Sequence, residues 1–142
     1  MSLRSAVRYW LPPILWAGFI FAASTNAFSS VHTAPWMARI LMAIFGHSLP
    51  QSQFETVHFS IRKLGHLTEY GILGALLFRA FRGDEKRRWD WRWSVSAVIL
   101  AAIYAATDEW HQSFVPSREP SAWDALIDTV GAALAQVLFF RR

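Results

Sequence analysis

The sequence contains no cysteine, which excludes disulfides, thiolate zinc sites and cysteine nucleophiles. Charge is also scarce: 17% of the 142 residues are charged, against about 25% in soluble domains. No Gly-rich phosphate loop, HExxH helix or Gly-x-Ser-x-Gly elbow occurs in the chain. The common enzyme signatures are therefore missing, and no repeat, low-complexity tract or linker divides the chain.

Hydrophobic residues, in contrast, are abundant. They make up 54% of the chain, the mean hydropathy is +0.22, and there are eight tryptophans, a residue enriched at membrane interfaces. The net charge of +4 resembles that of a nucleic-acid binder, but the basic residues lie between apolar runs, where they set membrane orientation. The composition therefore predicts a membrane protein with no nucleic-acid partner.

Four apolar runs organise the chain, at residues 9–31, 64–81, 93–115 and 122–140. The first is uncharged and reaches roughly 35 Å as a helix, against a hydrocarbon core of about 30 Å. The other three carry acids and histidines near one end, and without those ends each would reach only about 18 to 22 Å. The polar ends must therefore lie at least partly at membrane depth.

Residues 33–50 carry apolar residues at helical spacing beside Arg39, which is typical of a short amphipathic helix in the interface. Ser52 and Glu55 predict a capping box that opens the helix of the second span. The predicted fold is all-α: one domain over residues 1–142, an integral membrane bundle of four transmembrane helices with a short interfacial amphipathic helix after the first.

Basic residues predict the orientation. Ten of the fourteen lie before the first span, between the second and third, or at the C-terminus, so the positive-inside rule places both termini in the cytoplasm. The alternative for the first run is a cleaved signal peptide, because Thr25-Asn26-Ala27 resembles a cleavage site. Cleavage would leave the other three orientations unchanged.

This topology places seven of the ten acids and all five histidines at the outer side. Polar faces on three helices would be costly toward lipid, so we expect them to face one another. We expect Lys63 and Arg118 to be the counter-ions, and Gly131 and Ala135 to form a small-xxx-small packing seam. The candidate ligand-binding residues are Lys63, His66, Glu69, Tyr70, Asp108, Glu109, His111, Gln112, Arg118, Asp124 and Asp128.

Several candidates also have an ordinary structural interpretation. Asp124 follows Ser121 by three positions and can complete a capping box. Glu109 can be a solvated loop residue, Tyr70 and Tyr104 can be packing residues, and His66 can be a contact between helices. Asp108 and Asp128 are predicted to lie deepest, and intramembrane acids are functional candidates by default. His66, Glu69, Asp108 and His111 could hold a hard divalent metal, but their spacing matches no dedicated site, so no metal or cofactor is predicted.

Three segments resemble the VanZ-like family: residues 63–74 (KLGHLTEYGILG), 107–118 (TDEWHQSFVPSR) and 124–131 (DALIDTVG). The resemblance covers roughly residues 60–135. The chain departs from the family pattern at Ser117, where Gly is usual, and at Asp128, where Asn is common. The resemblance implies a small multi-span protein of the bacterial cytoplasmic membrane, in a family named for low-level resistance to teicoplanin, a lipid-tailed glycopeptide.

The residues predict a small polar pocket open to the outer leaflet. We expect it to bind or handle an envelope amphiphile, either a membrane lipid or a lipid-linked envelope molecule, and the resemblance adds an effect on teicoplanin susceptibility. The alternatives are a membrane-embedded enzyme acting on a lipid head group and a small proton-coupled transporter. Catalytic residues, oligomeric state and partner proteins are not predicted.

Overall fold

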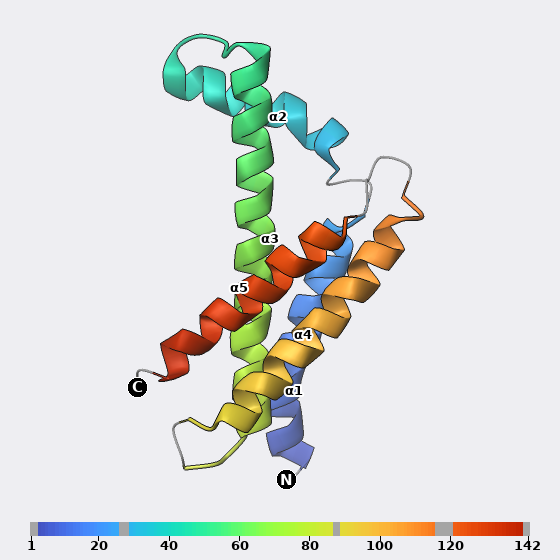
Figure 1. Cartoon of the computed structure of the whole chain (residues 1–142), viewed down its shortest axis with the longest axis vertical. Coiled ribbons are helices and arrows are strands. Elements are labelled where there is room, and N and C mark those ends of the chain that lie inside the picture. The colour runs from blue at the N-terminus through green and yellow to red at the C-terminus, as the bar shows by residue number, and fades with distance from the viewer. Residues whose placement is uncertain (1–2, 26–28, 87–88, 116–120, 141–142) are drawn as a thin grey trace.

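The computed structural model describes residues 3–25, 29–86, 89–115 and 121–140, and these segments contain helices and no strand. The all-α prediction is therefore confirmed. Five helices follow one another, α1 (Leu3–Ala23), α2 (Ser30–Phe45), α3 (Gln51–Arg82), α4 (Trp91–Gln112) and α5 (Ala122–Phe140). In Figure 1, α1, α4 and α5 gather around the C-terminal half of α3, while the N-terminal half of α3 extends past them and carries α2.

The helix boundaries agree with the apolar runs at some ends and differ at others. The fourth run coincides with α5. The first helix ends at Ala23 and not near residue 31, because Ser24 and Thr25 turn the chain with a bond from Thr25 Oγ1 to the Ala22 carbonyl oxygen (2.7 Å). The interfacial helix lies at Ser30–Phe45, a few residues before its predicted position.

Helix α3 is much longer than its apolar run, because the polar residues before Leu64 continue the same helix. Its 32 residues correspond to about 48 Å. The predicted capping box is wrong: Pro50 is the N-cap, and Glu55 Oε1 accepts a bond from the side chain of Gln51 (2.6 Å). Ser52 lies inside the first turn.

Within the described residues, two helices are long and apolar enough to cross a membrane by length and composition, α1 and α5. The apolar part of α2, Val31–Phe45, is shorter. Helices α3 and α4 contain more polar residues.

The helices of the core approach each other very closely where α3 meets α5. A Cβ atom on Gly74 would lie 2.8 Å from Cα of Ala132, and one on Gly131 would collide with the carbonyl oxygen of Leu67. The two backbones therefore touch, as in small-residue seams of membrane helices, and Gly131 lies in this seam as predicted. Apolar side chains fill the bundle next to it: Tyr70, Leu73, Leu77, Phe78, Ala97, Ala101 and Ala105.

Polar bonds attach α1 to the rest of the bundle at two levels. The Tyr9 hydroxyl donates to Asp84 in the α3–α4 loop (2.8 Å), and this bond lowers the pKa of the Asp84 carboxyl. Two turns further along α1, Trp16 Nε1 donates to the carbonyl oxygen of Glu69 (2.9 Å). At the next residue, the Ala17 carbonyl oxygen accepts from Tyr104 Oη (2.6 Å). Helix α1 is therefore bonded to both α3 and α4.

Candidate functional site

The start of α5 is capped by Ser121, the residue just before it, together with a side chain of α4. Ser121 Oγ accepts from the Trp123 amide (3.2 Å), as an N-cap serine does. The Ser121 amide donates to Oε2 of Glu109 on α4 (2.8 Å). In a capping box this second bond would go to Asp124, so Glu109 takes the role expected of Asp124. Glu109 is only 8% exposed, and its interpretation as a solvated loop residue is wrong.

Because Glu109 accepts the hydrogen bond of the Ser121 amide, the Asp124 carboxylate is available for another partner. It forms an ion pair with Lys63 of α3. Both side chains are partly exposed, 24% for Lys63 and 16% for Asp124. The pair therefore lies at the edge of the site, and Lys63 is a counter-ion as expected, with Asp124 as its partner.

Asp108 lies near the end of α4 and is 3% exposed. Its Oδ2 accepts from the Ser24 hydroxyl (2.7 Å) and from the Gln112 amide (2.9 Å), whereas Oδ1 has no partner. These donors are neutral, and the expectation of a cation beside Asp108 is not met among the described residues. Arg118, the other expected counter-ion, lies outside the described residues.

Ser24 is a site residue that sequence reasoning missed. It is 4% exposed and lies in the turn directly after α1, a helix that the prediction left out of the site. The available signal was the pair of hydroxyl residues, Ser24 and Thr25, that interrupts the first apolar run. Spacing alone cannot show that this turn lies beside α4, 84 residues further along the chain.

Asp128 is fully buried, with 0% exposure, and its Oδ1 lies 3.3 Å from Nδ1 of His66 on α3. This is an ion-pair distance, although neither atom has hydrogen-bonding geometry toward the other. Asp128 Oδ2 has no hydrogen-bond partner either. His66 therefore contacts α5, as the interpretation of an interhelical contact requires, but the Asp128 carboxylate is left with unused acceptor capacity.

The two tyrosines of the site differ. The Tyr104 hydroxyl is satisfied by the Ala17 carbonyl oxygen, in agreement with a packing role. Tyr70 is 0% exposed, and its hydroxyl has no partner. The carboxylates of Asp108, Glu109 and Asp128 lie close enough to act on this hydroxyl electrostatically. Tyr70 therefore lies near the acids of α4 and α5.

We use the name polar cluster for five residues that have buried polar atoms without a hydrogen-bond partner and that act on one another electrostatically: His66, Tyr70, Asp108, Glu109 and Asp128. The remaining candidates surround it. Gln112 donates a hydrogen bond to Asp108. The His111 ring packs against Phe21 of α1 at a centroid distance of 4.5 Å. Glu69 acts electrostatically on His66 from the same helix.

The polar cluster contains more acceptors than donors. Asp108 Oδ1, Glu109 Oε1 and both Asp128 oxygens are acceptors when ionised, and only the Tyr70 hydroxyl and the His66 ring can donate. Within the described segments, no group of three or more His, Asp or Glu side chains is placed to hold a metal ion. The arrangement can therefore receive hydrogen-bond donors or positive charge from a bound molecule or from water.

An all-helical bundle with two apolar helices of membrane-crossing length and a buried polar cluster indicates a helical membrane protein. The chain belongs to the VanZ/LLP1 family, whose model matches residues 9–141. No curated protein and no solved structure matches it. Family membership links the chain to VanZ-like proteins and glycopeptide resistance.

Proposed function

We propose that the chain crosses the bacterial cytoplasmic membrane four times, with α1, α4, α5 and the C-terminal half of α3 as spans. Helix α4 is less apolar in composition, but its acids point inward: Asp108 and Glu109 are 3% and 8% exposed, whereas Val95, Ile99 and Ile103 are 45% to 56% exposed. Its outer surface is therefore apolar and compatible with lipid, because intramembrane charges face the bundle interior.

The proposed orientation places both termini and the α3–α4 loop in the cytoplasm, on the basis of the basic residues at these positions. The polar cluster then lies toward the outer face, where α1 and α4 end and α5 begins (Figure 1). In this orientation α2 lies in the outer interface.

The proposed function is to bind the polar head of an envelope amphiphile. The observation that carries it is the set of buried carboxylate oxygens without hydrogen-bond partners on Asp108, Glu109 and Asp128, all close enough to Tyr70 to act on its hydroxyl electrostatically. Each buried polar atom left unsatisfied costs about 1 to 3 kcal/mol, so a donor-bearing head group has several positions to satisfy. The apolar surfaces of the surrounding helices can hold the tail of the same molecule, as the bilayer does.

The bundle interior argues against a transporter. On the cytoplasmic side of the cluster, Leu73, Leu77, Phe78, Ala97 and Ala101 are buried apolar residues. Gln136 is a buried polar residue among them: its amide nitrogen donates to the backbone oxygens of Gly74 (3.2 Å) and Ala132 (2.9 Å), and its Oε1 has no partner. A continuous polar path inward is therefore not supported, and binding at the outer face is favoured.

The test is drug susceptibility in a sensitive Gram-positive host. Overexpression of the chain is expected to lower sensitivity to teicoplanin more than to a glycopeptide without a lipid tail. Glu69→Gln and Asp108→Asn are near-isosteric and are expected to remove the protection at unchanged membrane abundance.

Glu55→Gln is the matched control, because Glu55 is an exposed carboxylate of α3 and is not part of the polar cluster. It is expected to protect as the parent does. Protection by Asp108→Asn equal to that of the parent would contradict the site, and no protection by the parent would contradict the resistance link.

A further inference from the structure

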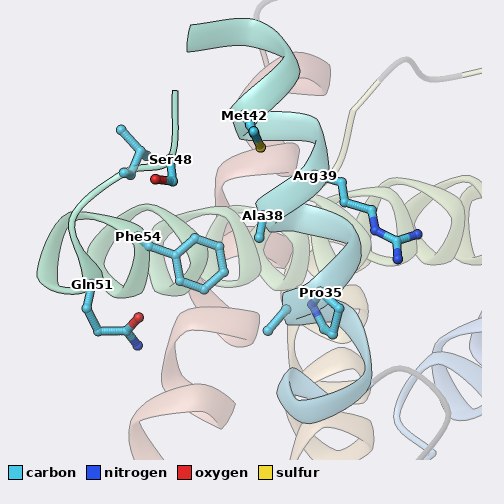
Figure 2. Close-up of a pocket in the computed structure, with 9 residues that line it drawn as sticks. Pro35, Ala38, Arg39, Met42, Ser48, Gln51 and Phe54 are labelled. Carbon is cyan, nitrogen blue, oxygen red and sulfur yellow. The ribbon is translucent and has the colours of Figure 1, made fainter. Parts of the chain in front are cut away.

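A hollow lies at the N-terminal end of α3, away from the polar cluster. We call it the α2–α3 groove. It has a volume of about 400 Å³ and is lined mainly by Ala34, Pro35, Ala38 and Met42 of α2 and Phe54 of α3, with Arg39 at one side. Figure 2 shows the Phe54 ring facing Ala38, with Arg39 on one side and Gln51 on the other. The small α2 side chains leave this space open.

The helix that forms one wall of the groove buries little of its apolar surface. Trp36, Ile40, Ile44 and Phe45 are 53% to 68% exposed, and between Val31 and Phe45 only Leu41 is buried. An apolar helix of a membrane protein with this much uncovered surface lies against lipid. The groove therefore opens where acyl chains are available.

The charge of the lining favours an anion. Arg39 is the charged residue of the groove, and no acid lines it. The guanidinium of Arg39 lies 5.4 Å from the centroid of the Trp36 ring, and within the described residues no carboxylate forms an ion pair with it. Glu55, one turn after Gln51, is held by the Gln51 side chain and lies outside the lining.

We propose that the α2–α3 groove binds one anionic phospholipid, with an acyl chain between Ala38 and Phe54 and the phosphate at Arg39. The apolar walls bury the acyl chain. The Arg39 guanidinium favours an anionic head group over a neutral one, because Arg binds phosphate through several parallel donors. This site is separate from the polar cluster, so its occupancy does not depend on the function proposed for that cluster.

The experiment is native mass spectrometry of the detergent-purified full chain, titrated with dimyristoyl phosphatidylglycerol or dimyristoyl phosphatidylcholine. The parent is expected to retain one phosphatidylglycerol more tightly than phosphatidylcholine. Arg39→Gln is expected to weaken phosphatidylglycerol binding between about threefold and tenfold, as the loss of one charge-assisted contact would. Ala38→Trp fills the groove and is expected to weaken both lipids.

The matched control is Arg92→Gln. Arg92 is also exposed and lies over a tryptophan, 5.7 Å from the Trp91 ring centroid, but it is not among the residues that line the α2–α3 groove. It is expected to leave both affinities unchanged. Equal retention of the two lipids by the parent would overturn the proposal, as would an equal loss in Arg92→Gln. A dimer that Ala38→Trp abolishes would identify a second copy of the chain as the occupant and would also overturn it.

Discussion

At the scale of single residues, the neutral donors around Asp108 determine how much stability the protein loses when this carboxylate is removed. Ser24 and Gln112 both donate to its carboxylate, so Asp108→Ala removes the acceptor of two buried neutral donors and leaves Gln112 with only a long bond to Ser24 Oγ (3.5 Å). We expect the detergent-solubilised protein to lose about 1 to 3 kcal/mol of unfolding free energy. Stranding a buried charge would cost more, about 3 to 5 kcal/mol. Chemical unfolding in mixed micelles measures the difference.

The control for Asp108 is Glu55→Ala, which is expected to change stability by about 0.5 kcal/mol or less, as surface substitutions do. Equal losses in the two variants would show that Asp108 is not desolvated. Asp108→Asn keeps an acceptor for Ser24 and is expected to lose less stability than Asp108→Ala.

The ion pair of Lys63 and Asp124 gives a second prediction at this scale. Because both side chains are partly exposed, water screens the pair, and its coupling energy is expected to be about 0.5 to 1 kcal/mol. A double-mutant cycle with Lys63→Gln and Asp124→Asn measures this energy in the same unfolding assay. A coupling energy of zero would show that the pair contributes nothing to the contact between α3 and α5.

At the scale of helices, the seam between α3 and α5 depends on glycine. Gly74→Ala would place a Cβ atom 2.8 Å from Ala132, and separating the backbones is expected to cost about 1 to 3 kcal/mol. Gly65→Ala is the matched control on the same helix, because nothing lies within 4 Å of the added atom. It is expected to be neutral or to stabilise by up to about 1 kcal/mol. Equal destabilisation by the two variants would mean that the seam is not closely packed.

The helices also show what the sequence could predict. Apolar periodicity located α5 to the residue and α2 and α4 to within a few residues. It did not detect the outer half of α3, where the polar residues 51–63 carry no apolar run but continue the helix. The Ser52–Glu55 pattern did place the start of this helix within two residues of Gln51, although the capping bonds differ. The early end of α1 depends on the turn at Ser24 and Thr25, which periodicity does not detect.

The site was predictable to a similar degree. The polar residues of three helices were expected to face one another, and the structure shows Lys63 and His66 of α3 in contact with Asp124 and Asp128 of α5. The partners of Glu109 and Asp108 were not predictable, because Ser121 and Ser24 reach them only through the packing of separate helices. Pairing between helices is a tertiary property that a single sequence does not encode locally.

At the scale of the whole molecule, the four-span orientation gives a direct prediction. Reporter fusions after Glu85 and after Arg142 are expected to be cytoplasmic, because basic residues concentrate on that side. A reporter in the region of Gln51–Gln53 is expected to be external. An external signal from the loop between α3 and α4 would reverse the position of the polar cluster.

The bonds that join α1 and the turn after it to α4 also limit the order in which the molecule can assemble. They join residues 84 to 88 positions apart, Ser24 to Asp108, Ser24 to Gln112 and Ala17 to Tyr104. The ribosome synthesises α1 first, at about 5 to 20 residues per second, so Asp108 is synthesised several seconds after Ser24. The Glu109–Ser121 bond spans only 12 residues and can close as soon as α5 emerges. The hairpin of α4 and α5 can therefore form as a local unit, and its docking onto α1 completes the burial of Asp108.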